Sequence, residues 1–465
     1  MIKNDSESYY SAAIKVAEML AAYLAESQSG AMPVVKLKSI GAIRDELKIR
    51  ELISEGGMDE WRLTEFLQKY LDNSMHMHHP NYIGHQVAVP HPAAALADMI
   101  HGLICNPMSI YEMGPSAAAI EKEMVNWMLE KVGWLESGAG LFTHGGSLAN
   151  IHAMLAARAD LDPESWTKGV QQDMVVLAPE NTHYSIARAI GIIGLGQNAI
   201  IPIPTDQNEV VITEKLPRLI AKIRDDNKAI MAVIANACAT STGIYDPVDE
   251  MGDICHAYDC WFHVDSPHGA SAILSTKYQH LLKGLEKADS LVWDAHKMMQ
   301  TSSLSTGLLF RNKKHFYQTL AQKASYLIHD KENPGFDVLP YQIECTKSAI
   351  ATKLFFVLAA IGENGMGEFI TSLYDNSRHF ARLINDRPGF ICEIPVQSNI
   401  ILFRYKPEKF DQLQLREKLI QSGAFYITST EVKGIRYLRL VVMQTNTTAE
   451  TIELLLDKIT AIAGE

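Results

Sequence analysis

SLVWDAHKMM, at residues 290–299, places a lysine directly behind a short apolar run. The run has the length of a buried strand, and Lys297 follows it with His296 as its neighbour. Burying a lysine amine is costly unless the amine has a chemical task, such as bonding covalently to a carbonyl group. A lysine on a surface loop fits the same pattern, so this stretch alone leaves both interpretations open.

Similar short apolar runs precede and follow this stretch and alternate with helical patterns. They are MVVLAP (174–179), AIIPIP (199–204), AIMAVIANA (229–237), CWFHVD (260–265) and STGLLFR (305–311). Strands that alternate with helices in this way predict an α/β fold with a mainly parallel sheet and helices on both faces.

The two ends of the chain follow other patterns. Residues 1–75 show helical spacing of apolar residues, which predicts a helical arm with one face that must pack on a partner. Residues 76–365 are expected to form the large domain and residues 366–465 a small α/β domain, with the glycines of GENGMGEF at the boundary. The last helix is expected to start at Thr447, which has capping-box spacing to Glu450.

Two further segments place polar groups at the ends of predicted strands. In CWFHVDSPHGA (260–270), Asp265 ends a strand, where a carboxylate can keep the ring nitrogen of pyridoxal phosphate protonated. In LFTHGGSLANIHAML (141–155), a strand leads through Gly145, Gly146 and Ser147 into a helix, and the backbone N–H groups of such a turn bind phosphate. Glycines also occur in such turns for conformational reasons, so this pair alone is weak evidence.

A phosphate turn, a strand-end aspartate and a lysine, in this order, resemble the layout of fold-type I pyridoxal phosphate enzymes. The sequence resembles the group II amino-acid decarboxylases, which act on glutamate, cysteine sulfinate, aromatic amino acids or 2,4-diaminobutyrate. The resemblance extends from HHPNYIGHQ (78–86) to YLRLVVMQTNTT (437–448). It implies a mainly parallel seven-stranded sheet between helices, pyridoxal 5'-phosphate as cofactor, and a homodimer.

The resemblance also implies roles for single residues. Lys297 matches the lysine that binds the cofactor covalently, His296 the histidine that contacts its phosphate, and Asp265 the partner of its ring nitrogen. His183, in PENTHYSIARA, matches the histidine that stacks on the ring; without the resemblance it would be interpreted as a core histidine. The remaining matches are Gly145, Gly146, Ser147 and Thr240 at the cofactor, and His85 and Arg439 at the substrate.

Several positions depart from the family pattern. Pro267 and His268 follow Asp265 in place of smaller or aromatic residues, and Asp294 stands where the family has an asparagine near the phosphate, which argues against a ligand role there. The segment 325–347 contains no obvious counterpart of the family's loop tyrosine. His329 and Tyr341 are candidates for its role, and neither is assigned.

Composition narrows the classes of partner. The net charge is −12, so the negative phosphate backbone of a nucleic acid would repel this protein, and nucleic acid is not expected as a partner. The longest aliphatic stretches are shorter than the roughly 20 residues that cross a bilayer, so no membrane is expected either. Six cysteines are sparse for this length and predict reduced thiols in the cytoplasm.

The histidines at positions 76–91 lack a recognisable coordination pattern, and no metal is expected.

These observations predict decarboxylation of an L-amino acid to the corresponding amine and carbon dioxide. The substrate is expected to be acidic (glutamate, aspartate or cysteine sulfinate) or 2,4-diaminobutyrate, with a slight preference for the first. Two alternatives stay open at this point. One is an aminotransferase or carbon–carbon lyase of the same fold, and the other is a catalytically silent binding paralogue.

Overall fold

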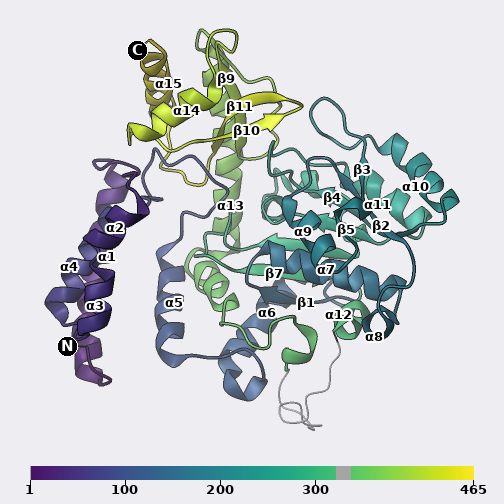
Figure 1. The fold of residues 1–465 in the computed structure, drawn as a ribbon, viewed down its shortest axis with the longest axis horizontal. Coiled ribbons are helices and arrows are strands. Elements are labelled where there is room, and N and C mark those ends of the chain that lie inside the picture. The colour runs from purple at the N-terminus through teal and green to yellow at the C-terminus, as the bar shows by residue number, and fades with distance from the viewer. Residues whose placement is uncertain (1, 321–336, 465) are drawn as a thin grey trace.

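A computed structural model describes residues 2–320 and 337–464 of the chain (Figure 1). Its centre is a seven-stranded sheet in the order β1-β7-β6-β5-β4-β2-β3. The strands are β1 (Ala139–Thr143), β2 (Met174–Pro179), β3 (Ile200–Ile203), β4 (Ala229–Asn236), β5 (Phe262–Asp265), β6 (Ser290–Asp294) and β7 (Thr306–Phe310). Only β7 runs antiparallel to its neighbours, so the prediction of a mainly parallel seven-stranded sheet is confirmed.

Helices cover both faces of this sheet, because neighbouring residues of a strand point to opposite sides. Along β2, Val176 belongs to one hydrophobic core and Leu177 to the other. The helices of this region are α6 (Pro115–Lys131), α7 (Gly146–Leu161), α8 (Ser165–Lys168), α9 (Tyr184–Ile192), α10 (Leu216–Asp225), α11 (Val248–Ala257) and α12 (Lys313–Thr319). Residues of α7, α9 and α12 contribute to one core, and residues of α6, α10 and α11 contribute to the other.

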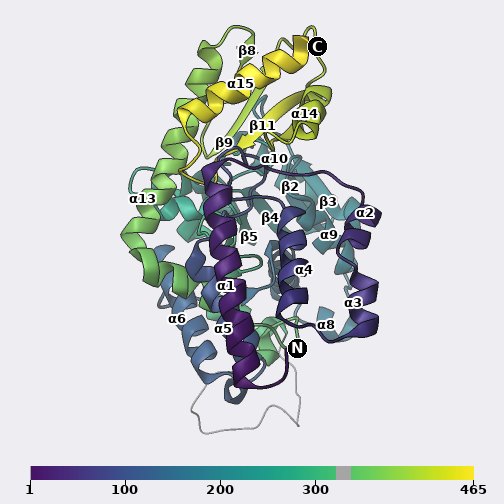
Figure 2. The same cartoon turned by 90° about the vertical axis from the view of Figure 1, so that its left-hand side faces the viewer.

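The N-terminal helices form a layer of their own along one side of the molecule (Figure 2). They are α1 (Ser6–Ser29), α2 (Ile40–Glu46), α3 (Ile49–Glu55) and α4 (Glu60–Asp72), and α5 (Pro92–Ile104) follows them. Of the 24 residues of α1, only Ser27 is buried. An apolar cavity of about 810 Å³ lies between α1, α4 and α5. The helical arm thus leaves much of its apolar face uncovered in a single chain.

The C-terminal region contains a second sheet with the order β10-β11-β9-β8, all antiparallel. Its elements are β8 (Phe390–Ile391), β9 (Ile400–Tyr405), α14 (Gln412–Gln421), β10 (Thr428–Val432), β11 (Ile435–Val441) and α15 (Ala449–Gly464). The long helix α13 (Ala351–Asp386) leads into it, with a non-helical break at Gly362. The expected domain boundary at residue 365 falls inside α13, and the domain limits stay a prediction.

The last helix, expected to start at Thr447, starts at Ala449, and its capping residue lies one position later than predicted. Thr448 caps it, because Thr448 Oγ1 accepts a hydrogen bond from the backbone N–H of Thr451 at 3.4 Å. Thr447, the predicted cap, instead donates its hydroxyl proton to the carbonyl of Pro80 at 2.7 Å. The Thr447 side chain, which the local spacing predicts as the helix cap, therefore makes a long-range hydrogen bond instead.

Helix α13 contains the most apolar long stretch of the described residues. By length and composition it is the one described helix that could cross a membrane. In this fold it contacts α5, α6 and α15, and its residues Leu354, Val357 and Ile370 are fully buried. The stretch LFFVLAAIG (354–362) thus contributes to the hydrophobic core.

Candidate active site

The predicted site residues meet at the carboxyl-terminal edge of the central sheet. Asp265 is the last residue of β5 and Asp294 the last of β6, and these strands are parallel neighbours. Lys297 follows three residues after Asp294, while His183 precedes α9 and thus follows β2. In open α/β sheets this edge is where ligands bind, because the loops that change direction leave a crevice there.

Asp265 is 3% exposed and keeps one carboxylate oxygen without a partner. Asn150 Nδ2 donates to its Oδ1 at 3.1 Å, and no donor among residues 2–320 and 337–464 contacts Oδ2. Burial raises the pKa of Asp265 to about 6, an effect that Asn150 and Lys297 oppose. Burial disfavours the charged form of the Asp265 carboxylate. A protonated ring nitrogen beside Oδ2 would favour that charged form again.

Lys297 lies beside a buried carboxylate. Its Nζ is 3.2 Å from Asp294 Oδ2, and its side chain is 20% exposed. Thr306 Oγ1 donates to Asp294 Oδ1 at 2.5 Å, and His296 Nε2 lies 3.5 Å from Asp294 Oδ2. Asp294 therefore pairs with the lysine, and the expectation that it does not bind the phosphate stays a prediction. The His296 ring is also held by the backbone of Ser305, whose carbonyl lies 2.9 Å from Nδ1.

The predicted phosphate turn begins the 16-residue helix α7. Gly145 has φ +98°, a conformation that L side chains rarely adopt, and Gly146 starts the helix. A Cβ on Gly146 would lie in ordinary van der Waals contact, 3.4 Å from Pro267 Cγ and 3.5 Å from Asp294 Oδ1, so this position lies beside Asp294 without requiring glycine for space. The first-turn N–H groups of Gly146 and Ser147 have no intrahelical acceptor and suit an anion.

His183 caps α9 and is half-buried. Its Nδ1 lies 2.7 Å from Ser185 Oγ and accepts from the Ser185 backbone N–H at 3.3 Å. Burial, then the charge of Lys297, lowers the pKa of His183 to about 4, so its ring is neutral near pH 7. A neutral imidazole is suited to lie against an aromatic ring without adding charge.

Arg439 on β11 joins the second sheet to the site. Its guanidinium donates to the carbonyls of Thr240 at 2.7 Å, Ser241 at 3.2 Å and Gly84 at 3.4 Å. A fourth contact goes to Thr428 Oγ1 at 3.3 Å. The residue is 6% exposed, and no carboxylate within the described ranges forms an ion pair with it. Four contacts leave one of the five N–H groups of this buried cation for a further partner.

His85 and Thr240 lie close to this arginine. His85 Nε2 is 3.1 Å from the hydroxyl of Tyr426, and burial followed by the charges of Arg439 and Arg416 lowers the pKa of His85. Thr240 contributes its carbonyl to Arg439, while its side chain is exposed. The predicted substrate residues thus lie together where the second sheet meets the large domain.

Some expectations fall elsewhere. Tyr341 packs against Phe316 and Tyr317 with ring centroids 5.4 and 5.0 Å apart, beside α12, and His329 lies outside the described residues. Lys347 donates to Glu121 at 2.5 Å and to the Phe142 carbonyl at 2.6 Å. Lys347 therefore holds the backbone of β1 close to where that strand leads into the glycine turn.

The sequence reasoning missed four polar residues that complete the site. They are Asn150, Ser185, Arg416 and Tyr426. Asn150 carried a signal, because it is polar at helical spacing from Gly146 in a helix otherwise rich in alanine and aliphatic residues. Arg416 and Tyr426 carried no such signal in the sequence, because their position near His85 depends on how the second sheet packs against the rest of the chain.

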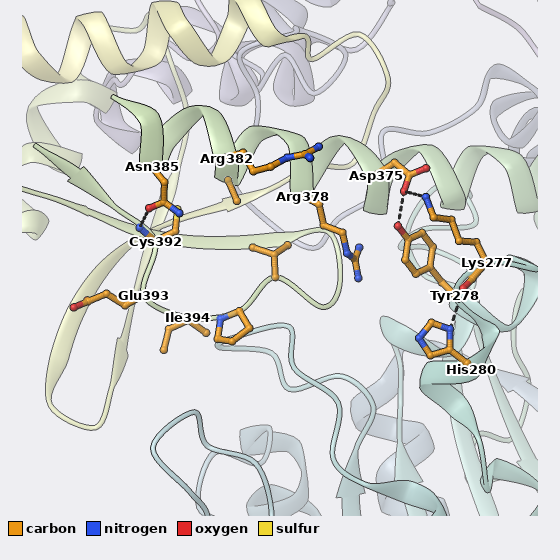
Figure 3. A pocket seen from close by; sticks show the side chains of 13 residues that line it. Lys277, Tyr278, His280, Asp375, Arg378, Arg382, Asn385, Cys392, Glu393 and Ile394 are labelled. Carbon is orange, nitrogen blue, oxygen red and sulfur yellow. Dashed lines mark hydrogen bonds and ion pairs between the residues drawn. The ribbon is translucent and has the colours of Figure 1, made fainter. Parts of the chain in front are cut away.

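Two other features are separate from this site. A cavity of about 980 Å³ lies between α13 and the segment 392–396 (Figure 3). Lys277 pairs there with Asp375 at 2.6 Å, and none of the predicted site residues lines it. Within the described part of the chain, no group of three or more histidine, cysteine, aspartate or glutamate side chains is arranged to hold a metal ion.

The conserved domain of pyridoxal-dependent decarboxylases matches residues 62–406, and the chain therefore belongs to this family. The human acidic amino acid decarboxylase GADL1 is 26% identical over 87% of this chain and 82% of its own. The L-2,4-diaminobutyrate decarboxylase of Acinetobacter baumannii is 25% identical, over 92% of this chain and 89% of its own. The crystal structure of mouse CSAD superposes with a TM-score of 0.92 at 23% identity and covers 99% of each chain.

The family and the relatives confirm three predictions made from the sequence. The fold is that of fold-type I enzymes, the cofactor is pyridoxal 5'-phosphate, and the reaction is the decarboxylation of an amino acid. The chain is thus a pyridoxal phosphate-dependent carboxy-lyase, and the aminotransferase, carbon–carbon lyase and silent-paralogue alternatives are not favoured.

Proposed function

We propose that this chain releases carbon dioxide from an acidic L-amino acid, with 2,4-diaminobutyrate as the alternative substrate. The observation that carries the proposal is the charge around the substrate residues. Arg439 is buried without a carboxylate partner in the described residues, and the charged groups that act on His85 are Arg439 and Arg416. A second carboxylate on the substrate would neutralise this positive region, whereas a second amine would be repelled by it.

The roles of the remaining residues follow from their places. We assign the covalent link to Lys297, the phosphate to the turn Gly145–Ser147 and His296, the ring nitrogen to Asp265, and the ring face to His183. When bound, the cofactor supplies a ring that accepts the electron pair released as the Cα–carboxylate bond breaks. Asp265, once ionised, holds a proton on the ring nitrogen.

The other cofactor and substrate contacts are also proposals. Thr240 would lie beside the cofactor, because it follows β4 at the same sheet edge and its carbonyl holds Arg439. His85 would line the substrate side together with Arg439. Asp294 keeps the amine of Lys297 in place before the cofactor arrives, through the 3.2 Å contact.

The test is a direct comparison of substrates. Carbon dioxide release is measured from glutamate, aspartate, cysteine sulfinate, 2,4-diaminobutyrate, tyrosine and tryptophan with cofactor-loaded enzyme. The proposal expects the highest kcat/KM for an acidic substrate, and Arg439→Met should remove most of that preference. A higher kcat/KM for diaminobutyrate or for an aromatic substrate would overturn the proposed specificity. Release from none of them would contradict decarboxylation itself.

We also propose that the chain forms a homodimer through its N-terminal layer. Exposed apolar side chains on α5 support this, with Leu103 62%, Ile104 56% and Leu96 56% exposed. Leu96 and Leu103 line the apolar cavity between α1 and α5, and exposed apolar surface of this kind marks an interaction site. The second copy is the proposed occupant, and light scattering on the purified protein tests it. The cytoplasmic location stays a prediction.

A further inference from the structure

A buried amide connects Asp265 to His183. Asn150 lies on α7, one turn beyond the glycine turn, and is 1% exposed. Its Nδ2 donates to Asp265 Oδ1 at 3.1 Å and to Ser185 Oγ at 2.8 Å, so both amide hydrogens are used. Ser185 Oγ in turn lies 2.7 Å from His183 Nδ1. One side chain of α7 thus reaches both residues that are assigned to the cofactor ring.

The carbonyl end of this amide is fixed from the opposite side. Asn150 Oδ1 lies 3.0 Å from His263 Nε2, and His263 Nδ1 lies 2.7 Å from Ser290 Oγ. Trp261 Nε1, which can only donate, contacts Ser290 Oγ at 3.0 Å. Because Asn150 turns Nδ2 toward the Asp265 carboxylate, its Oδ1 accepts from His263 Nε2; the single proton of the neutral His263 ring therefore lies on Nε2, and Nδ1 accepts from the Ser290 hydroxyl. A flipped amide would set its oxygen against the Asp265 carboxylate, so only one orientation satisfies every group.

The same counting of donors and acceptors fixes the state of His183. Ser185 Oγ already accepts a hydrogen bond from Asn150, so its own proton is available to His183 Nδ1. The backbone N–H of Ser185 faces the same nitrogen at 3.3 Å. Because Nδ1 accepts, the single proton of the neutral ring lies on Nε2.

We propose that Asn150 is a positioning residue that sets Asp265 and His183 together. It holds Oδ1 of Asp265, which leaves Oδ2 for the ring nitrogen, and through Ser185 it keeps a donor hydrogen on Nε2 of His183. The inference rests on the proposed roles of these two residues at the cofactor. The charged groups that act on Asp265 are Lys297 and Asp294.

The experiment compares Asn150→Leu with His152→Leu in cofactor-loaded protein. His152 is a matched control, because it lies on the same helix and is also 1% exposed. Two readouts are taken: the pH midpoint of the visible absorption of the bound cofactor, and kcat and KM for the preferred substrate. Asn150→Leu should move the midpoint by about one pH unit or more. It should also lower kcat by about 10²-fold with little change in KM, whereas His152→Leu should leave the midpoint in place.

Two further variants keep the test decisive. Asn150→Asp has nearly the same shape and is measured in the same way if the leucine variant does not fold. Ser185→Ala interrupts only the His183 branch, so it should lower kcat and leave the midpoint unchanged. A folded Asn150 variant with the wild-type midpoint and kcat would overturn the proposal. If wild-type protein releases no carbon dioxide, the proposed function fails, while the absorption midpoint still decides the role of Asn150.

Discussion

Replacing Asp265 with asparagine should make the cofactor-free protein more stable at neutral pH. Burial raises the pKa of Asp265 from 3.8 to about 6, so folding keeps a carboxylate charged where it is disfavoured. A shift of about 2.2 units at 1.36 kcal/mol per unit corresponds to about 3 kcal/mol. Asparagine removes this penalty, because it is neutral at every pH and its oxygen still accepts from Asn150.

The sign of the pH dependence follows from the raised pKa. The folded protein binds the Asp265 proton more tightly than the unfolded chain, so the favourable contribution is present below about pH 4. It is lost as the pH rises through about 6. The advantage of Asp265→Asn should therefore be about 3 kcal/mol at pH 7.5 and about half of that at pH 5.

Urea unfolding of cofactor-free protein at the two pH values measures this difference. Asp45→Asn is a suitable control, because the Asp45 side chain is 71% exposed. An offset between wild type and Asp265→Asn that does not change with pH would refute the reasoning, since a lost hydrogen bond alone gives such an offset. Adding the cofactor should stabilise wild type more than the variant, because only the carboxylate pairs with a protonated ring nitrogen.

Three further outcomes are expected. Lys347→Met should lower the unfolding free energy by about 3–5 kcal/mol, because it leaves Glu121 charged and buried at 6% side-chain exposure; urea unfolding measures the loss. Arg439→Lys should raise KM for the preferred acidic substrate more than it lowers kcat, since an ammonium lacks the planar fork of donors; steady-state kinetics separates the two. Leu103→Asp should shift the protein toward monomers in light scattering, whereas Leu454→Asp, at the 59% exposed Leu454 on α15, should not.

The sequence predicted the central sheet because its strands are short apolar runs bounded by polar residues. Each of the six quoted runs became a strand, and Lys297 and Asp265 lie at the sheet edge that the parallel order implies. Local spacing was less reliable where tertiary contacts compete. Thr447 lost its capping role to a contact with Pro80, and helix α13 passes through the glycines near residue 365.

Side-chain networks were not predictable in the same way. Asp294 and Lys297 both stood out in the sequence. Their pairing could not be predicted, because it depends on how the chain turns between the end of β6 and Lys297. Arg416 acts on His85 across more than 300 residues of chain, and no local pattern signals such a contact. Asn150 was visible only as a polar residue in an apolar helix, and its partners come from the distant strand β5 and the start of α9.

The central claim is that the amine of Lys297 carries the cofactor. Borohydride reduction of the loaded protein, followed by protease digestion and mass spectrometry, locates the cofactor on the chain. The account predicts the label on the peptide that contains Lys297, and its loss together with turnover in Lys297→Ala. A label on a different side chain, or normal turnover in Lys297→Ala, would contradict it.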